Sequence, residues 1–495
     1  MSEGVKGAGL DGATDGATES RPVTSREVAR RVLDRVADDG AWATPALDGE
    51  LARAGLDDRD RRLASELVYG VLRHRTRIDR AIGAHAELER TPPKIVTVLR
   101  VAAYQILLLD RVPGYAAVDD AVATANVLSP KLGGFVNAVL RKLTANGELP
   151  FEALANDSMD AHLARLEIEH STPRWILDEL TAATRDEVRA TLEARGIDTK
   201  QGTAFAEARI ARVGELARAF AQPAPIVARV NARRATRDAV IAELEAAGVT
   251  ATPIDSAPMA LRLDGLGDPS REKAFLAGRW TVQDTGAQHV GIAAARAVAG
   301  ASSVRILDAC AGVGGKSTHL AELLADTTAA SAAASTESAA SPGATVAIDA
   351  ADISATKLAL GRDTAARLGL DNIRVIACDL LDESAPIGRD YDLVVLDAPC
   401  TGLGVLRRHP DAKWRLRSSD VKRLAELQRM LLDAVVPRIK PGGILVYSVC
   451  TFTRAEGPEQ VAALVKRAGL ELVSQERTWP PDADAFYLAT LRRPA

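Results

Sequence analysis

The sequence predicts a multidomain protein: an all-α bundle, then a small α+β module, then an α/β domain built on a parallel sheet. The chain has 495 residues, which is too long for one ordinary core, and its hydrophobic content of 47% is that of a globular protein. Apolar residues recur at helical spacing in the first part of the chain. Strand and helix patterns alternate in its last part, which is typical of an α/β sheet.

The composition narrows the class of protein further. Residues 1–22 are rich in Gly, Ala and Ser and lack an apolar h-region, so we expect a disordered tail and no signal peptide. No apolar run reaches transmembrane length, which predicts a cytoplasmic protein with no membrane partner. The four cysteines are widely spread and form no CxxC pair, which argues against a disulfide framework or a zinc site and favours a reducing compartment.

Residues 23–148 are predicted to form the all-α domain. Thr24 or Ser25 can cap a first helix that runs through Arg35. The segment Ile95–Leu109 is apolar on nearly all sides and therefore belongs at the centre of a bundle. Further helices are predicted over Ala64–Leu72, Ile78–Ala84, Ala117–Leu128 and Gly134–Leu143.

The basic side chains of this domain permit two interpretations. They include Arg73, Arg75, Arg77, Arg80, Arg141 and Lys142. Such a run is usually a solvated helix face, but it can also contact RNA phosphates. The formal net charge of −4 gives the whole chain no basic field, although a local basic face is enough to bind nucleic acid.

Residues 149–290 are predicted to hold connecting helices and the small α+β module. Ile226–Asn231 has a strand pattern, and Ala235–Gly248 is an amphipathic helix closed by a glycine. Leu261 and Leu263 alternate with polar neighbours. These alternations fit a small sheet lined by a helix.

Residues 291–495 are predicted to form the α/β domain, with a Rossmann-like parallel sheet covered by helices on both sides. Its strands are expected at Val304–Leu307, Val346–Ala351, Ile373–Ala377, Leu393–Leu396, Ile444–Val449, Leu470–Val473 and Phe486–Leu491. Residues 326–343 are mostly Ala, Ser and Thr, a composition that cannot build a core, so we expect a disordered surface insertion there.

The stretch Tyr391–Arg408 places reactive side chains at the end of one of these strands. The apolar run stops at Asp397-Ala398-Pro399-Cys400, because proline lacks a backbone donor and fixes φ. In open α/β sheets this edge is where ligands bind. A buried structural cysteine remains an alternative for Cys400, since free cysteine is often only a small hydrophobe.

A glycine-rich turn follows the first strand of the sheet. It comprises Cys310, Ala311, Gly312, Val313, Gly314, Gly315 and Lys316. Such a turn lets the backbone approach a ligand and directs free helix N–H groups toward it, although glycines also serve turns that bind nothing. It is not a phosphate loop, because that motif needs glycine where Cys310 stands.

Carboxylates follow the next strands. Asp349 and Asp352 come after the second strand, where an acid can accept hydrogen bonds from a ribose diol, and Asp379 comes after the third, on the side of an adenine. Each acid alone could be a helix cap. Together with Asp397 they occupy three successive strand ends, which predicts a nucleoside pocket.

A second thiol is directed to the same edge. A Pro-Gly-Gly turn precedes the apolar strand that ends at Cys450. Alone, Cys450 would be interpreted as structural. If its strand neighbours that of Cys400, two thiols face one cleft, and cysteine is intrinsically nucleophilic.

Taken together, these motifs resemble the bacterial 16S rRNA cytosine-C5 methyltransferases of the NOP/Sun group, in the RsmB/Sun branch with a NusB-like N-terminal domain. GVLRHRTRID, LRVAAYQILLLDRVP and GFVNAVLRKL look like the NusB-type RNA-binding domain, and RVNARRATRDAV and WTVQDTGAQ look like family segments outside the sheet. The resemblance covers nearly everything from Val23 to Arg493. It implies a class I methyltransferase domain that uses S-adenosylmethionine and acts on RNA, and we expect a monomer.

The resemblance also implies roles for individual residues. Cys310 to Lys316 stands at the family's cofactor loop, C-A-A-P-G-G-K. Asp352 stands at the ribose-binding acid, with Asp349 left open because the insertion blurs the spacing, and Asp379 stands at the adenine-side acid. Cys450 falls at the nucleophile of the family's S-T-C motif, and Asp397 and Cys400 fall in its D-A-P-C motif.

In the implied chemistry, the Cys450 thiolate adds to C6 of cytosine, so that C5 becomes nucleophilic enough to take the sulfonium methyl group. Asp397 steadies the pyrimidine, and Cys400 assists loss of the C5 proton and release of the product. The base must leave its stack to reach the cleft, which single-stranded or looped RNA makes easier.

The sequence departs from the family motifs at a few positions and leaves several choices open. Gly312 and Val313 replace the family's Ala and Pro, Val449 replaces its Thr, and Glu456-Gly457-Pro458-Glu459 stands where the family has E-N-E. The rRNA of the small subunit or its precursor is the expected partner, with transfer RNA or large-subunit rRNA as alternatives. An amino-group methyltransferase would carry (D/N)-P-P-(Y/F) at this strand end. A non-catalytic NusB-like RNA-binding factor is the alternative from another class.

Overall fold

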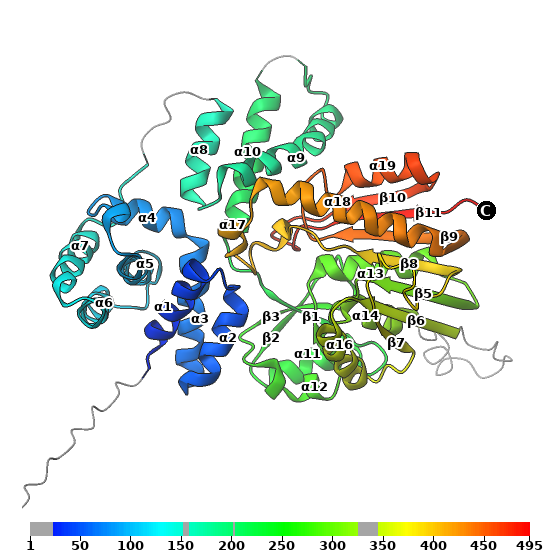
Figure 1. Cartoon of the computed structure of the whole chain (residues 1–495), viewed down its shortest axis with the longest axis horizontal. Coiled ribbons are helices and arrows are strands. Elements are labelled where there is room, and N and C mark those ends of the chain that lie inside the picture. Colours follow the sequence, from blue (N-terminus) through cyan, green and yellow to red (C-terminus); the bar gives the residue numbers. More distant parts are fainter. Residues whose placement is uncertain (1–22, 152–157, 201–202, 325–344) are drawn as a thin grey trace, which may run out of the picture.

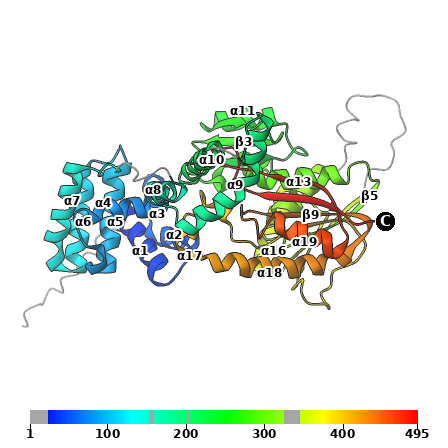
Figure 2. The ribbon, with the colours of Figure 1, turned by 90° about the horizontal axis from the view of Figure 1, so that it is seen from above.

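The computed structural model describes residues 23–151, 158–200, 203–324 and 345–495. The expected tail at 1–22 and the expected insertion at 326–343 lie outside these ranges. Along the described chain an N-terminal helical domain, a helical segment with a small sheet, and a large mixed sheet follow one another (Figure 1). The predicted fold class is confirmed. Figure 2 shows the helical domain at one end of the molecule and the large sheet at the other.

The N-terminal domain is all-α. Its helices are α1 (Ser25–Asp38), α2 (Ala43–Ala54), α3 (Asp58–Arg73), α4 (Arg75–Gly83), α5 (Pro93–Leu108), α6 (Gly114–Leu128) and α7 (Gly133–Asn146). Thr24 caps α1, because its side chain accepts a hydrogen bond of 3.2 Å from the backbone N–H of Glu27. Helix α2 was not singled out from the sequence, since Trp42 at its N-cap makes no side-chain capping bond.

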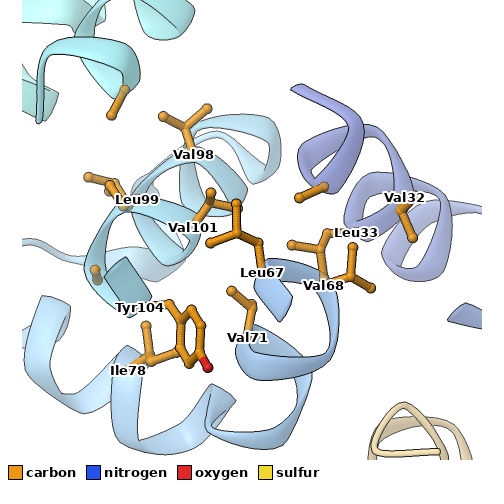
Figure 3. Close-up of a cluster of buried hydrophobic side chains, with 14 of the residues drawn as sticks. Val32, Leu33, Leu67, Val68, Val71, Ile78, Val98, Leu99, Val101 and Tyr104 are labelled. Atoms are coloured by element: carbon orange, nitrogen blue, oxygen red, sulfur yellow. The ribbon is translucent and has the colours of Figure 1, made fainter. Parts of the chain in front are cut away.

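The core of this domain surrounds α5, as its apolar composition predicts. Figure 3 shows Val101 and Tyr104 of α5 facing Leu67 and Val71 of α3. The Tyr104 ring lies so close to α3 that a Cβ at Gly70 would come within 2.0 Å of it. Glycine at this position is therefore a packing requirement, because buried side chains interdigitate with few voids.

Three helices lead from this domain to the sheets: α8 (Met159–Glu169), α9 (Arg174–Ala194) and α10 (Ala204–Phe220). Their apolar faces bury Leu177, Leu180 and Leu216. The same cluster contains Leu403 and Phe452, which follow two strands of the large sheet. The helices α8–α10 are thus packed against the carboxyl edge of that sheet.

The small module is a four-stranded antiparallel sheet in the order β2-β3-β1-β4. Its elements are β1 (Ile226–Val230), α11 (Arg237–Ala246), β2 (Thr250–Pro253), β3 (Ala260–Asp264), α12 (Lys273–Leu276) and β4 (Trp280–Val282). Trp280 is fully buried in its core and meets the Phe275 ring edge-on at 5.0 Å. The strands at Ile226 and at Leu261 were predicted, whereas the short β2 and β4 were not.

The large sheet has the order β10-β11-β9-β8-β5-β6-β7. Its strands are β5 (Ser303–Ala309), β6 (Thr345–Asp352), β7 (Ile373–Ala377), β8 (Tyr391–Asp397), β9 (Ile439–Val449), β10 (Glu471–Arg477) and β11 (Tyr487–Arg492). Strands β5 to β9 are parallel, and β10 and β11 join antiparallel. All seven predicted strands are present.

Helices cover both faces of this sheet. On one face lie α13 (Thr285–Ala297), α14 (Gly315–Leu324) and α16 (Ala355–Leu368). On the other lie α18 (Ser418–Val435) and α19 (Pro458–Ala468). The expected turn at Pro441-Gly442-Gly443 lies inside β9, where the pairing with β8 shifts register between Tyr391 and Leu393.

The basic stretch of the N-terminal domain binds neighbouring parts of the chain. Arg73 is buried and donates to the carbonyl of Arg407 at 3.2 Å. Arg77 pairs with Glu148 at 2.7 Å, and Arg80 donates to the carbonyls of residues 149 and 150. These three arginines bond to other parts of the chain, and contact of this stretch with RNA stays a prediction. Arg141 and Lys142 are exposed.

Among the described residues, no helix is both long enough and apolar enough to cross a membrane.

Candidate active site

The candidate site lies where β5, β6, β8 and β9 end. These four strands are parallel neighbours, so their carboxyl ends meet at one edge. The last residue of β8, Asp397, pairs in register with Ser448 of β9. The backbone N–H of Ala398 also donates to the carbonyl of Ser448 at 3.0 Å. The segments that follow the two strands therefore begin side by side.

This register brings the two thiols together. The sulfur of Cys400 lies 3.4 Å from that of Cys450. The residues that follow the two cysteines also meet, since the hydroxyls of Thr401 and Thr451 lie 2.9 Å apart. Two Cys-Thr pairs thus lie side by side at the strand ends. The sequence predicted the meeting of the thiols, whereas the meeting of the hydroxyls was not foreseen.

The buried carboxylate of Glu456 joins the two segments that follow Cys400 and Cys450. Glu456 accepts from the Thr401 hydroxyl at 2.6 Å and from the Thr401 backbone N–H at 2.7 Å. It also accepts from the Thr453 hydroxyl at 2.9 Å and from the Gln428 amide at 3.1 Å. Because Glu456 is fully buried, these four donors replace the water its charge requires. The sequence identified Glu456 only as part of a variant acidic motif.

Close backbone packing fixes the loop that follows Cys400. Gly404 donates to the carbonyl of Cys450 at 3.0 Å, and its own carbonyl accepts from Ala485 at 3.0 Å. A Cβ on Gly404 would lie 1.8 Å from the Ala485 carbonyl oxygen. Glycine at position 404 therefore allows this close approach between two segments of the protein.

The contact between the thiols changes the acidity of one of them. The hydrogen bond with Cys450, followed by burial, raises the pKa of the Cys400 thiol well above its usual range. Cys400 is thus the partner that keeps its proton. The pair presents one thiol held protonated beside a second sulfur 3.4 Å away.

Asp397 links the cysteine segments to the glycine-rich turn. One carboxylate oxygen accepts from the Ser448 hydroxyl at 2.7 Å, and the other pairs with the Lys316 ammonium group. Burial works against the charge on Lys316, but attraction to Asp397 outweighs it and raises the lysine pKa. The structure therefore joins Asp397 and Lys316, which the sequence had placed in separate motifs.

The glycine-rich turn is held in a conformation with positive φ angles. They are +65° at Cys310, +57° at Gly312 and +76° at Gly314. Gly314 packs on Gly361 of α16, where a Cβ would lie 3.3 Å from the Gly361 Cα. Glycine is favoured at both +57° and +76°, whereas Cys310 adopts its φ angle as a non-glycine residue.

The three candidate acids beyond β5 lie in different places. Asp352 ends β6, where its carboxylate accepts from the backbone N–H groups of Gly312 at 2.9 Å and Ser354 at 2.8 Å. Asp349 lies inside β6 and pairs with Arg374 at 2.7 Å, away from the turn. Asp379 is exposed and accepts from Leu381 N–H at 2.9 Å. Of the two alternatives on β6, only Asp352 lies against the turn.

The surroundings of Asp352 fit a nucleoside. Ile353 is 73% exposed and Val313 is 52% exposed, although both are large apolar residues. Apolar side chains that stay exposed beside a carboxylate and a glycine-rich turn offer a surface for a flat base. The side chains at this edge therefore fit S-adenosylmethionine, whose adenine needs an apolar surface and whose ribose needs a carboxylate.

The small four-stranded module stabilises the glycine-rich turn through one arginine. Arg229 of β1 is buried and makes two bonds to Glu322 of α14, at 2.8 and 2.9 Å. It also donates to the carbonyl of Gly315 at 3.1 Å and to the Thr318 hydroxyl at 3.1 Å. The beginning of α14, and with it the turn, is thus fixed by a side chain from another module. The sequence offered no signal for this beyond the family segment that contains Arg229.

The comparison with known proteins extends over the whole described fold. The model of the 16S rRNA methyltransferase RsmB/F family matches residues 297–492, the NusB family matches 23–145, and the RsmF/B-like ferredoxin-like domain matches 211–268. A methyltransferase of Mycobacterium tuberculosis strain H37Rv is 33% identical, with 95% of this chain and 96% of the relative covered. The chain belongs to the RsmB/F family. It is a methyltransferase, and S-adenosylmethionine is its cofactor.

Other relatives cover as much of the chain. The ribosomal RNA small subunit methyltransferase B of Vibrio cholerae is 31% identical, with 94% of this chain and 97% of the relative covered. The corresponding protein of Yersinia enterocolitica is 30% identical, with coverages of 94% and 98%. The crystal structure of PH0851 has the same fold, with a TM-score of 0.70 at 21% identity over 96% of this chain and 99% of that one.

Proposed function

We propose that this RsmB/F methyltransferase methylates C5 of a cytosine in the RNA of the small ribosomal subunit, through a covalent bond between Cys450 and C6 of the base. The observation that carries this proposal is the pair of thiols 3.4 Å apart at the strand edge. A single nucleophile would need only one of them. Two thiols in contact fit a reaction in which an enzyme–base bond must be made and then broken. The small-subunit substrate rests on the relatives named for it.

In the first step the Cys450 thiolate forms a bond to C6, and the electron pair of the C5–C6 double bond becomes available at C5. S-Adenosylmethionine supplies an electrophilic methyl group at this position when it is bound. Asp352 and the turn from Cys310 to Lys316 would hold this cofactor, with Asp379 on its adenine side. Asp397, kept in place by Lys316 and Ser448, would hold the pyrimidine while its charge changes.

In the second step Cys400 first gives its own proton to solvent, and its thiolate then takes the proton from C5. The electron pair of that C–H bond restores the C5–C6 double bond, and the Cys450 thiolate leaves C6 with its own pair. The raised pKa of Cys400 comes first from its contact with Cys450. Once the Cys450 sulfur is bonded to carbon it no longer carries charge, so the pKa of Cys400 falls and the thiol can serve as a base.

Trapping of the protein–RNA adduct tests these roles. We expect Cys400→Ala to accumulate a covalent complex with a small-subunit rRNA transcript in the presence of S-adenosylmethionine, because the adduct forms but cannot resolve. Cys450→Ala should form none. Both variants should bind S-adenosylmethionine as the wild type does, measured by calorimetry. The opposite pattern would exchange the two cysteines, and an absence of adduct in both would refute covalent catalysis.

Bisulfite sequencing tests the substrate. Ribosomal RNA from cells that lack the gene should lose one methylated cytosine in the small subunit, and expression of the wild-type chain should restore it. An unchanged rRNA map with a changed map of transfer RNA or of large-subunit rRNA would reassign the substrate. We place the reaction in the cytoplasm, and we expect a monomer.

A further inference from the structure

The α9–α10 hairpin carries a group of arginines with no assigned role. Arg77 and Arg80 of α4, which the sequence pointed to as part of an RNA surface, bond to Glu148 and to the carbonyls of residues 149 and 150. On α9, by contrast, Arg185 and Arg189 stand four residues apart and share one face. Arg209 of α10 stands beside them. We call Arg185, Arg189 and Arg209 the hairpin arginines.

Two acidic residues in the middle of α9 form ion pairs with other parts of the chain. Asp186 forms an ion pair of 2.6 Å with Arg454, which lies four residues beyond Cys450. Glu187 forms an ion pair of 2.9 Å with Arg212 and accepts from the Trp479 indole N–H at 3.0 Å. The helix thus uses its acids to dock on the methyltransferase domain and leaves its basic face outside.

Two of the hairpin arginines lie against the ring of Phe205. The guanidinium groups of Arg189 and Arg209 lie 5.4 and 5.5 Å from the centre of the Phe205 ring, within the range of cation–π attraction. In the described part of the chain none of the three forms an ion pair with a carboxylate, and the buried Nε of Arg209 has no hydrogen-bond partner. Burial and the charges of Arg185 and Arg189 lower the pKa of Arg209.

Such a cluster costs stability in the free protein, because like charges at short range repel one another. The chain has 66 acidic residues against 62 basic ones, so carboxylates to neutralise it are not scarce. Three neighbouring cations without an ion pair, two of them held against the Phe205 ring, form a preorganised anion site. Guanidinium forks match phosphate geometry, and a row of them matches a phosphate backbone.

We propose that the hairpin arginines bind the phosphate backbone of the RNA substrate, as a second contact away from the thiols. This inference rests on the proposed RNA substrate. The apolar base of the hairpin, at Leu177, packs in the same cluster as Phe452, two residues after Cys450. Arg189 lies twelve residues further along α9, roughly 18 Å from Leu177 at the rise of an α-helix, and three residues beyond Asp186, which pairs with Arg454. The contact therefore falls on nucleotides that flank the target base, on the α9–α10 hairpin at the top of Figure 1.

The test compares two triple variants of the full chain. The first changes Arg185, Arg189 and Arg209 to Gln. The control changes three arginines at the opposite edge of the large sheet to Gln: Arg296, Arg389 and Arg492, all exposed and without an ion pair among the described residues. Both remove the same charge. Binding of a small-subunit rRNA transcript is measured as a function of salt concentration.

We expect the first triple variant to bind the transcript ~10- to 100-fold more weakly at 0.15 M salt, and the control less than about threefold more weakly. The slope of log affinity against log salt should fall by about 2, since each single-strand phosphate contact contributes about 0.7. Affinity for S-adenosylmethionine and the kcat on a short cytosine oligonucleotide at saturation should stay unchanged, because neither reaches the hairpin.

Equal losses in the two triple variants would overturn the proposal, as would an unchanged salt slope. A lower unfolding midpoint of the first triple would indicate a structural role instead, since loss of mutual repulsion should leave the midpoint unchanged or higher. In that case Arg185→Glu separates the two roles, because the charge of this exposed residue can be reversed without disturbing the core. Weaker RNA binding at an unchanged unfolding midpoint would support the proposal, and unchanged RNA binding would overturn it. If the wild type neither binds nor methylates the transcript, the proposed function fails, whereas a wild type that methylates beside a variant that binds normally refutes the hairpin site alone.

Discussion

Two buried basic side chains join the methyltransferase domain to its neighbours, and they do so in opposite ways. Arg229 reaches from the small module into α14, where two bonds to Glu322 neutralise its charge and Gln283, Gly315 and Thr318 take its other donors. Both Arg229 and Glu322 are buried. The joint is a complete ion pair, built into the helix that follows the cofactor turn.

Lys413 makes the other joint. It lies in α17 (Ala412–Arg415), is 3% exposed and donates to the carbonyl of Arg73 in the N-terminal domain at 2.9 Å. Burial, with the nearby charge of Arg73, lowers the pKa of Lys413 from 10.5 to about 7. The neighbouring His74 is half-buried, and burial lowers its pKa to about 3. In this joint Lys413 and Arg73 donate to neutral backbone carbonyls, and the buried carboxylate of Asp411 accepts from the backbone N–H of Ala43 at 2.9 Å.

The two joints respond differently to pH. An arginine keeps its charge and fixes its partner by a planar fork, whereas a buried lysine can lose its proton. The Arg229 joint is therefore permanent and serves the shape of the cofactor turn. The Lys413 joint is half-charged near neutral pH and costs the folded state stability whenever it is protonated.

The largest effect is expected from Arg229→Met. The change leaves the Glu322 carboxylate buried without its partner, which costs about 3–5 kcal/mol in the free energy of unfolding. It also frees the beginning of α14, so affinity for S-adenosylmethionine should fall by an order of magnitude or more. Urea denaturation and calorimetric titration measure the two quantities.

A double variant separates the charge from the packing. Arg229→Met with Glu322→Leu removes both members of the pair and should regain most of the lost stability, because apolar residues of similar volume replace buried ion pairs well. The cofactor affinity should stay low, since the bond to the Gly315 carbonyl is still missing. Recovery of the affinity together with the stability would contradict a positioning role for Arg229.

The Lys413 joint predicts an effect of the opposite sign. The pKa of Lys413 is lower in the folded state, at about 7, than in the unfolded state, at about 10.5. Unfolding therefore takes up a proton between these values, so the contribution of Lys413 to stability rises with pH across this window and is lowest at and below pH 7. Lys413→Met should raise the free energy of unfolding at pH 7 by about 1–3 kcal/mol and flatten its rise toward pH 9.5 by a similar amount.

Urea denaturation at pH 7 and pH 9.5 measures this effect. His74 does not interfere, because both of its pKa values lie below the window. Lys440→Met serves as a control, since Lys440 pairs with Asp392 and gains from its charge. A variant Lys413→Met that keeps the wild-type slope would show that this lysine stays protonated in the folded protein.

The sequence predicted the parts of the site that depend on strand ends. Parallel strands share one edge, so the patterns before Asp397 and Cys450 were enough to bring two thiols and a carboxylate together, and the structure places them there. The turn at Cys310 was found for the same reason, whereas the strand pattern left Asp349 and Asp352 as alternatives on the next strand. These inferences need only the order of strands and helices along the chain.

The residues that support the site were not predictable in this way. Glu456 was identified only as part of a variant acidic motif, yet it is buried under both cysteine segments because three threonines and a glutamine converge on it. Arg229 stands in a strand of another module and meets Glu322 93 residues later. Arg73 belongs to a run that favours a solvated face. Such long-range burial of polar groups leaves no periodic pattern, so a single sequence does not reveal it.

The smallest effect is expected from Trp414→Phe, which concerns the Lys413 joint without its charge. The indole N–H of Trp414 donates to the carbonyl of Leu72 at 2.7 Å. Phenylalanine keeps most of the packing but leaves this carbonyl without its donor, which costs about 1 kcal/mol in the free energy of unfolding. The cost should be the same at 0.05 and 0.5 M salt, because a neutral acceptor is not screened.

A salt dependence in Trp414→Phe would mean that the joint to the N-terminal domain contains an ion pair, and the contrast with Arg229 would then disappear. Equal costs at both salt concentrations would leave the contrast standing. The small module would be held by a buried charge pair, and the N-terminal domain by uncharged backbone groups: carbonyls that accept from Lys413 and Trp414, and the N–H of Ala43 that donates to the buried Asp411 carboxylate at 2.9 Å. Removal of the N-terminal domain takes a neutral donor from a carboxylate, whereas removal of the small module takes the counter-charge of Glu322, so the first costs the methyltransferase domain less.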